Sequence, residues 1–383
     1  MKILLITDQE PRSEHSAIRG IFDNHLRELA EVHIVWFSRE NKRIELDERQ
    51  TTLPWRYRKW ALLWRFHSPL ALNEFDIVIV RNLFVVLQGL LGVTQRPYQL
   101  GFWESFPHSF RRLHEAEKTK RSLLRKRIEY RIRSICEDKL LSACDFYLPI
   151  TQTFAKLFRP HLTIPAHPLP MGVDSNQLPP LASRVAAKDR ALRLIYAGAV
   201  DGLRGFDVIL DALSSSDNDF VLDLFSASRN ATTNAIERDA DYRIRLFKAI
   251  PRTELLKRMC DYDVGLALIP NDPLYDVASP TKTMEYYAMG LPALMSPLAE
   301  HRFLFDESSG YFCTLDKTSI IEAIEQLCRT PRTLLAQMGE VGRKRVIDER
   351  SYNCMASELL SFLGKIREAH DAAGESRAVP TSQ

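Results

Sequence analysis

A cation and a carboxylate lie one helical turn apart in the segment SPTKTMEYYAMGLP, which begins at Ser279. The pattern predicts a helix that Ser279 caps, with Pro280 at its first position and a stop at Gly290. Lys282 then lies in the first turn, where a cation opposes the helix dipole unless an anion binds there. A diphosphate is such an anion, and Glu285 could accept hydrogen bonds from two ribose hydroxyls. An exposed ion pair between Lys282 and Glu285 is the alternative interpretation.

A glycine-rich turn, AGAVDGLRGFD, begins at Ala197 and contains Gly198, Arg204 and Gly205. Glycine lets a ligand approach the backbone closely, and the Arg204 guanidinium could make a two-pronged contact with a phosphate. Both turns follow predicted strands, and open parallel sheets bind ligands at the carboxyl ends of their strands. Together the two turns indicate a site for a nucleotide diphosphate.

The elements that would position these turns form two α/β series, separated by a stretch with five prolines between 161 and 180. In the first series, apolar runs alternate with helical patterns at 2–7, 17–30, 32–37, 75–80, 83–91, 146–150 and 152–158. In the second, they alternate at 192–198, 207–213, 220–225, 253–260, 264–269, 282–289 and 292–295. Strands that are apolar on both faces predict parallel sheets covered by helices on each side.

The second series resembles the nucleotide-sugar half of a glycosyltransferase with the GT-B fold, nearest to glycosyltransferase family 4. The matching residues are Gly198 to Gly205, IPRTEL at 250–255, LIP at 268–270 and the pattern Ser-Pro-x-Lys-x-x-Glu-Tyr-x-Ala-x-Gly-x-Pro. The first series resembles that family more loosely, at 1–7, 145–151 and 171–174. The resemblance implies an α/β chain of two Rossmann-like domains whose parallel sheets face each other across a cleft.

On this basis we expect an acceptor-binding domain at 1–175 that a helix at 352–369 completes, and a nucleotide-sugar domain at 185–351. Residues 370–383 are expected to form a disordered tail.

The resemblance also implies roles for residues of the donor site. Arg204 and Lys282 would hold the donor diphosphate beside the Gly198 turn, Ser279 and Thr281 would offer backbone N–H groups, Ile250 would lie beside the base, and Glu285 would bind the ribose. One position departs from the family pattern, because Val277 stands where a second Glu is common and Asp276 is displaced by one. This departure leaves the contacts to the donor sugar open.

A catalytic base is expected from the first domain, at the predicted strand end YQLGFWESFPH. Glu104 and His108 are the candidates, since burial beside Trp103 and Phe106 would raise the pKa of a carboxylic acid. An ordinary surface carboxylate and a loop histidine are the alternative. Asp8 and Arg12, which follow the first strand, are weaker candidates for the same site.

The expected chemistry is the departure of a nucleotide diphosphate from an oxocarbenium-like sugar, with cations neutralising the leaving group. No Asp, Cys or His spacing is typical of a metal site, and the six scattered cysteines form no C-x-x-C pair. We therefore expect metal-independent transfer without a cofactor. The resemblance favours retention at the anomeric carbon, and UDP is the commonest donor base among such enzymes.

Two basic segments are expected to contact an anionic membrane surface. In the segment 111–135, Leu124, Ile128, Ile132 and Ile135 share one helical face among many arginines, and 55–66 combines three tryptophans with basic residues. A helix that covers the core with its arginines in solvent is one alternative. Nucleic acid is another, which a pI near 8.5 and the absence of a known motif disfavour.

Composition limits the remaining possibilities. The 383 residues suit two domains, 45% are hydrophobic, and 52 Lys and Arg nearly balance 49 Asp and Glu. These values exclude a mainly disordered chain, and no apolar run is long enough to span a bilayer. The short apolar start that turns acidic at Asp8 lacks the features of a secretory signal, so we expect a cytoplasmic protein at the inner face of the membrane.

The combined prediction is a glycosyltransferase that moves a sugar from a nucleotide donor to a lipid-linked or saccharide acceptor in bacterial envelope polysaccharide assembly, such as capsule, O-antigen or exopolysaccharide. A nucleotide-sugar epimerase on the same fold and a non-catalytic scaffold that retained the fold are the two alternatives. Val277 keeps the scaffold open, whereas Arg204, Lys282 and Glu285 count against it.

Overall fold

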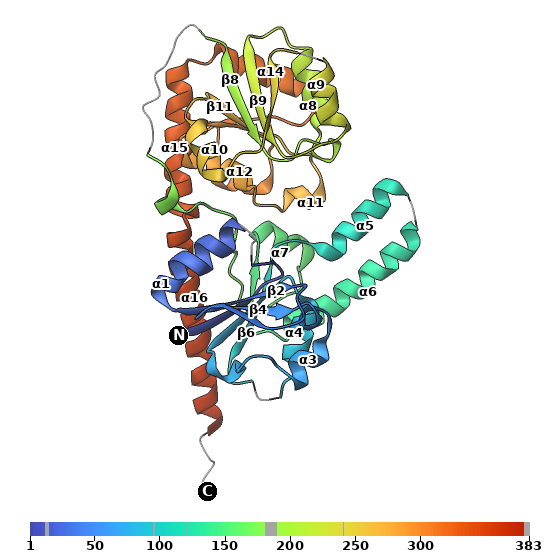
Figure 1. Cartoon of the computed structure of the whole chain (residues 1–383), viewed down its shortest axis with the longest axis vertical. Helices are drawn as coiled ribbons and strands as arrows, with labels where there is room; N and C mark the ends of the chain where they lie inside the picture. Colours follow the sequence, from blue (N-terminus) through green and yellow to red (C-terminus); the bar gives the residue numbers. More distant parts are fainter. Residues whose placement is uncertain (12–14, 95, 121, 181–189, 240, 379–383) are drawn as a thin grey trace. The chain divides into compact units, whose positions relative to one another are not determined.

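The chain folds into two units, each built around its own parallel sheet (Figure 1). The computed structural model describes residues 1–11, 15–94, 96–120, 122–180, 190–239 and 241–378. Unit 1 comprises Met1–Pro170 and Tyr352–Gln383, and unit 2 comprises Met171–Ser351. The first boundary thus falls within the proline-rich stretch, five residues before the expected position 175.

Unit 1 contains a seven-stranded sheet in the order β3-β4-β2-β1-β5-β6-β7. The strands are β1 (Lys2–Ile6), β2 (Glu31–Ser38), β3 (Ile44–Asp47), β4 (Gln50–Pro54), β5 (Ile77–Arg81), β6 (Gln99–Glu104) and β7 (Phe146–Pro149). Every pair is parallel except β3 with β4. After β2 the chain continues on one side of β1 and then returns to its other side at β5. The carboxyl ends of β1 and β5 therefore flank a topological switch point, where open sheets bind ligands.

Helices cover both faces of the first sheet. They are η1 (a π-helix, Ile18–His25), α1 (Leu26–Leu29), α2 (Arg56–Lys59), α3 (Ala61–Phe66), η2 (Leu72–Glu74), α4 (Phe84–Leu91), α5 (His108–Thr119), α6 (Leu123–Ser142), α7 (Gln152–Phe158) and α16 (Tyr352–Ala378). The basic segment 111–135 spans two helices, α5 and α6, and its expected apolar face belongs to α6 alone. The chain reverses between them, and Lys120 and Ser122 adopt left-handed backbone angles there.

The long helix α16 returns to unit 1 and packs against η1 and α1 (Figure 1). Its Phe362 ring contacts Phe146 of β7 and His167, and a Cβ atom at Gly20 would overlap the ring of Tyr352. The helix continues to Ala378, so the expectation of a disordered tail from 370 is wrong for residues 370–378. Residues 379–383 lie outside the described part of the chain.

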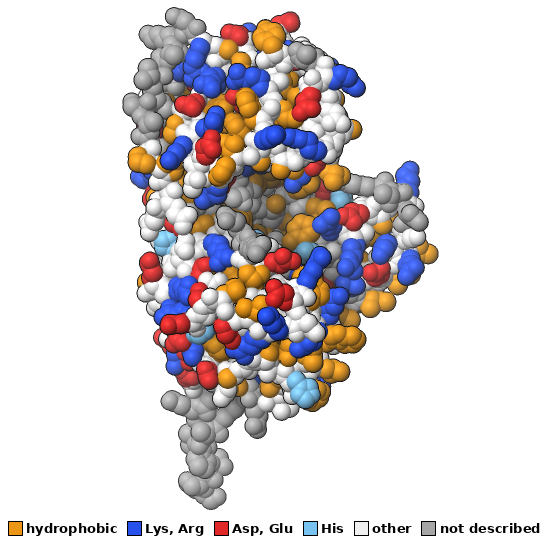
Figure 2. All heavy atoms as spheres, viewed as in Figure 1, with side chains coloured by type: hydrophobic (Ala, Val, Ile, Leu, Met, Phe, Trp, Pro, Cys, Tyr) orange, Lys and Arg blue, Asp and Glu red, His pale blue; other side chains and the backbone are white. Residues whose placement is uncertain are grey.

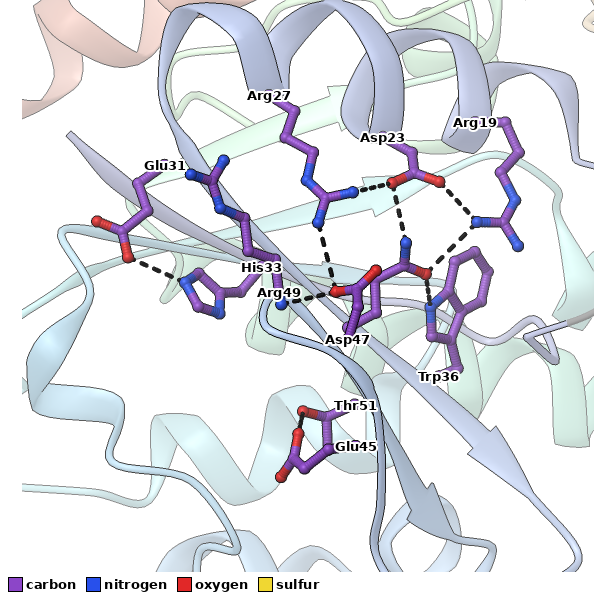
Figure 3. A network of polar contacts seen from close by, with 11 residues as sticks. Arg19, Asp23, Arg27, Glu31, His33, Trp36, Glu45, Asp47, Arg49 and Thr51 are labelled. Carbon is purple, nitrogen blue, oxygen red and sulfur yellow. Dashed lines mark hydrogen bonds and ion pairs between the residues drawn. The ribbon is translucent and has the colours of Figure 1, made fainter.

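A polar network joins η1 to the strands β2 and β4 (Figure 3). Asp23 accepts hydrogen bonds from Arg19, Arg27 and the Gln50 amide, and Gln50 Oε1 accepts one from the Trp36 indole at 3.0 Å. Because Trp36 and Gln50 are buried, these bonds satisfy groups that would otherwise be costly to desolvate. The network fixes the helix that follows the first strand.

Unit 2 contains a six-stranded, all-parallel sheet in the order β10-β9-β8-β11-β12-β13. The strands are β8 (Leu192–Ala197), β9 (Phe220–Ser226), β10 (Ile244–Lys248), β11 (Val264–Ala267), β12 (Ala293–Met295) and β13 (Tyr311–Phe312). The switch point of this sheet lies between β8 and β11, which are the strands that precede the two turns singled out from the sequence.

Helices also cover both faces of the second sheet. They are η3 (Ser175–Gln177), η4 (Gly202–Arg204), α8 (Phe206–Ser214), α9 (Ala231–Asp239), α10 (Arg252–Met259), α11 (Pro273–Asp276), α12 (Thr281–Ala288), α13 (Ala299–Leu304), α14 (Lys317–Arg329) and α15 (Arg332–Arg350). Helix α12 is buried along most of its length, with Met284, Tyr286 and Tyr287 inaccessible to solvent. In the described residues, no helix is both long and apolar enough to cross a bilayer.

Candidate functional site

The turn after β8 brings a cation to the switch point of unit 2. Gly198 adopts φ +144°, a conformation that side chains rarely allow, and the Ala197 N–H donates to the Tyr286 hydroxyl of α12 at 3.1 Å. Asp201 then caps η4 and accepts a hydrogen bond from the Arg204 guanidinium at 2.9 Å. Gly205 ends this turn at φ +71°. The strand end, the turn and α12 thus form one connected structure around Arg204.

Helix α12 starts one residue later than expected, because its cap position is Pro280 and not Ser279. It begins at Thr281, Pro280 is the residue before its first turn, and no side chain caps it. The Ser279 hydroxyl instead accepts a hydrogen bond from the Met171 N–H at 3.0 Å. The expectation of a Ser279 side-chain cap is therefore wrong, because that hydroxyl anchors the start of unit 2. The first-turn N–H groups, including that of Thr281, have no intrahelical acceptor, as at any helix start.

Lys282 lies half-buried in this first turn, with Nζ 3.9 Å from the centre of the Tyr196 ring. Burial and, to a smaller extent, the Arg204 charge lower the pKa of the Lys282 ammonium to about 7, although the Asp201 charge opposes the shift. Arg204 and Lys282 thus have one neighbouring carboxylate, that of Asp201, and it forms its ion pair with Arg204. A bound anion would offset the repulsion and raise the pKa of Lys282.

Glu285 is buried and pairs with Arg252 of α10, whose Nε lies 2.5 Å from Glu285 Oε1. This pair replaces the exposed ion pair with Lys282 considered as the alternative, so that interpretation is wrong. Arg252 follows Ile250 by two residues, and Ile250 packs half-buried against the core beneath α12. Ile250, which is expected beside the base, and Glu285, which is expected to bind the ribose, are therefore linked through Arg252 at the start of α10.

A buried histidine holds α12 in place. His301 Nδ1 lies 2.7 Å from the Ser296 carbonyl oxygen, and its Nε2 lies 2.9 Å from the Thr283 hydroxyl. Burial lowers the pKa of His301 to about 4, so the ring is neutral at pH 7 and donates to the carbonyl while it accepts from the hydroxyl. These bonds fix the orientation of the helix that carries Lys282 and Glu285.

The surroundings of Glu104 in unit 1 differ from those expected. Its side chain is almost fully buried at the end of β6, where Arg159 donates to both carboxylate oxygens at 2.6 and 3.0 Å and Tyr147 donates at 2.8 Å. Arg159 also pairs with Glu137 of α6 at 2.8 Å. The expected partly open surroundings of Glu104 are therefore wrong, because its carboxylate is buried and paired with a buried guanidinium.

His108 and Asp8 do face a common cavity of about 820 Å³ in unit 1. Desolvation is the main cause that lowers the pKa of His108, while the nearby Asp8 charge opposes the shift. Asp8 forms an ion pair with Arg81, which is buried at the end of β5. The other weak candidate, Arg12, lies outside the described residues. Of the two expected catalytic residues, only His108 lines this cavity.

Solved structures with 12–14% sequence identity share this two-unit fold. A sucrose-phosphate synthase from Thermosynechococcus elongatus superposes with a TM-score of 0.70 at 14% identity, over 97% of this chain and 100% of that one. The lipopolysaccharide outer core galactosyltransferase WaaB in its apo form gives 0.66 at 12%, over 95% and 99%. Anabaena HepE in complex with UDP gives 0.65 at 12%, over 94% and 100%.

A comparison of the sequence with models of protein families indicates the activity. A family described as glycosyl transferase-like matches residues 209–361, which include α12 and the turn before α10. The chain is a glycosyltransferase of the GT-B fold. A search of curated protein sequences finds no match.

Two features of this glycosyltransferase escaped the sequence analysis. Arg252 lies within the IPRTEL turn, but local spacing does not predict its pairing with Glu285, because 33 positions separate them. The sequence also does not predict that cations of the two basic segments line one cavity of unit 1. The described part of the chain contains no group of three His, Cys, Asp or Glu side chains placed to hold a metal ion.

Proposed function

We propose that the glycosyltransferase binds a nucleotide-diphosphate sugar, with UDP as the favoured carrier, at the carboxyl ends of β8 and β11. The single observation that carries this proposal is the pair of cations, Arg204 and Lys282, at a helix start where Lys282 loses affinity for its proton. A diphosphate supplies the missing negative charge and accepts hydrogen bonds from the first-turn N–H groups of α12.

Glu285 binds the ribose in this proposal. Its carboxylate projects from α12 and is oriented by Arg252, so it can accept hydrogen bonds from two hydroxyls. The half-buried Ile250 provides an apolar neighbour for the base. The HepE structure, solved with UDP, supports a uridine carrier by analogy of fold.

Transfer breaks the bond between the anomeric carbon and the diphosphate oxygen and forms one to an acceptor hydroxyl. Arg204 and Lys282 stabilise the charge that develops on the leaving diphosphate, so the reaction proceeds without a metal. We assign His108 as the group that receives a proton, because its lowered pKa keeps the ring neutral at pH 7. The anomeric configuration is retained, as the resemblance to family 4 implies.

The acceptor is a lipid-linked saccharide of bacterial envelope polysaccharide assembly, met at the cytoplasmic face of the inner membrane. Exposure of apolar side chains on α6 supports this part of the proposal. Leu124, Ile128, Ile132 and Ile135 are between 49% and 74% exposed, so their helical face does not cover the core. Figure 2 shows basic and hydrophobic side chains together over α5 and α6.

A second exposed group lies on helix α3 and on Trp60, the residue before it. Trp60, Leu62 and Phe66 are each more than 60% exposed, and Arg65 stacks on the Phe66 ring with 5.0 Å from its Cζ atom to the ring centre. Helix α3 packs on α4, and α4 packs on α6. Aromatic and basic side chains of this kind suit the lipid interface.

A thermal-shift panel of UDP, GDP and dTDP sugars tests the donor site. One carrier is expected to stabilise the protein, by about 2.7 kcal/mol at a concentration 100 times its Kd. Lys282→Ala removes the shift, whereas Lys257→Ala, on the exposed face of α10, retains it. An unchanged shift in Lys282→Ala contradicts the proposal. Conversion of the donor sugar at C2 without an acceptor indicates the epimerase instead.

A further inference from the structure

The cavity in unit 1 carries an excess of positive charge. Five cations line it: Arg58, Lys59, Arg111, Arg112 and Arg133. The three carboxylates among the lining residues are all engaged, since Asp8 pairs with Arg81, Glu115 with Arg111 and Glu137 with Arg159. The cavity therefore favours an anionic ligand over a neutral one.

Two of these cations approach the cavity from different helices with little compensation. Arg112 of α5 and Arg133 of α6 lie 3.9 and 3.7 Å from the same carboxylate, Glu129. Glu129 forms its shorter ion pair, 2.9 Å, with Lys126. The two guanidiniums are therefore loosely held, and each carries a fork of N–H donors that matches the oxygens of a phosphate.

The lining of the cavity also includes apolar and aromatic side chains. Trp55, Leu83, Phe84 and Val85 line it, and Arg58 stacks on the Trp55 ring with 4.5 Å from its Cζ atom to the ring centre. Arg58 Nη1 also donates to the Asp8 carbonyl at 2.8 Å, which fixes this cation near the carboxyl end of β1. A volume of about 820 Å³ lies in the usual range for small-molecule sites and admits a phosphate together with a sugar.

From these observations we infer that the glycosyltransferase takes an acceptor that carries a phosphate or diphosphate group, which Arg112 and Arg133 bind in the cavity of unit 1. The inference rests on the proposed function, because it names the chemical class of the acceptor of that reaction. Phosphate in the acceptor comes either from a lipid diphosphate or from a soluble sugar phosphate. Both sources offer the same charge to the two guanidiniums.

Cys136 gives a direct readout of binding, since this exposed thiol lines the same cavity. The rate of its alkylation by N-ethylmaleimide, followed by peptide mass spectrometry, is measured with the full chain. Glucose 6-phosphate and farnesyl diphosphate in detergent are the probes, and glucose and farnesol are their neutral counterparts. We expect one or both phosphate probes to slow the alkylation and the neutral counterparts to leave it unchanged.

The two probes distinguish the sources of phosphate. Protection by glucose 6-phosphate indicates a soluble sugar phosphate, and protection by farnesyl diphosphate alone indicates a lipid diphosphate. The double variant Arg112→Gln/Arg133→Gln is expected to raise the probe concentration for half-protection by about tenfold or more. Arg131→Gln, two positions away on α6 and outside the cavity lining, is expected to leave it unchanged.

Equal protection by phosphate and neutral probes overturns the inference, as does a double variant that behaves like Arg131→Gln. Nucleotide binding is measured on the same samples by the thermal shift of UDP. A UDP shift that persists while phosphate protection fails removes this inference and leaves the proposed donor site intact. Loss of the UDP shift in the unaltered protein removes the proposed function itself.

Discussion

In unit 2 the carboxyl ends of β8 and β11 present Arg204 and Lys282 with one shared carboxylate, whereas in unit 1 the carboxyl end of β1 presents Asp8 already paired with Arg81. The positive charge of unit 1 comes instead from long side chains on α2, α5 and α6. The same topological position therefore holds an uncompensated site in one unit and a neutralised one in the other. A short motif can encode the first arrangement, but the second depends on helices far apart in the sequence.

Removing Arg159 tests whether the ion pairs of unit 1 are structural. This substitution is expected to have the largest effect on stability, because two buried carboxylates share this cation. Arg159→Met leaves the carboxylates of Glu104 and Glu137 buried without their cation. The free energy of unfolding is expected to fall by about 3–5 kcal/mol, measured by urea denaturation. Arg125→Met on the exposed face of α6 serves as the control. A fall of less than about 1 kcal/mol would mean that Glu104 keeps another partner or is free to act as a base.

Replacing Glu285 sharpens the comparison by separating the two parts of the donor. Glu285→Gln is expected to weaken UDP binding by about 1.5–3 kcal/mol, because it removes a charged acceptor of ribose hydroxyls. Inorganic pyrophosphate, which has no ribose, is expected to bind the variant and the unaltered protein equally. Isothermal titration calorimetry with both ligands measures the difference. Equal losses for the two ligands would contradict the ribose role of Glu285.

Raising the pH tests the uncompensated cation of unit 2. Lys282 has a pKa of about 7 in the free protein, and a bound diphosphate raises that pKa. Above pH 7, binding therefore requires proton uptake, and the affinity for UDP is expected to fall by up to about tenfold per pH unit, or 1.4 kcal/mol. Titrations in buffers of different ionisation enthalpy measure the proton uptake. Lys282→Arg keeps its charge and is expected to bind independently of pH over this range; the same slope in this variant would assign the proton elsewhere.

The smallest change in stability is expected for substitutions on the exposed face of α6. Ile128→Ser/Ile132→Ser alters side chains that are more than half exposed, so the free energy of unfolding is expected to change by less than about 0.5 kcal/mol. Flotation with vesicles that contain anionic lipid is nevertheless expected to be lost. Leu29→Ser, at the exposed end of α1, is the matched control. Flotation of the double variant at the unaltered level would show that this face does not bind the membrane.

Elements with strong apolar periodicity were predictable from the sequence, and those that depend on distant partners were not. The strands 2–7, 32–37 and 75–80 correspond to β1, β2 and β5, with ends that differ by two residues or fewer. Strand β3 was missed because three of its four residues, in IELD, are exposed and leave no apolar run. The turn between α5 and α6 was missed because Lys120 and Ser122 adopt positive φ without a glycine to indicate it.

The candidate site follows the same division. Arg204 and Lys282 lie in local motifs at the switch point of one sheet, so their proximity was predictable from topology alone. The environment of Glu104 was not predictable, because its cation, Arg159, is 55 positions away on the segment after α7. Likewise, the pairing of Glu285 with Arg252 depends on the docking of α10 against α12. Neither pairing leaves a signal in local spacing.

The return of α16 to unit 1 has a consequence for how the protein folds during synthesis. Unit 2 is one continuous stretch, Met171–Ser351, whereas unit 1 combines its first 170 residues with Tyr352 and beyond. During synthesis, unit 1 therefore lacks its last helix until about 180 further residues have been made. Unit 2 can fold before that helix is synthesised. A premature stop codon shortly before position 352 would leave unit 2 nearly complete but would deprive unit 1 of helix α16.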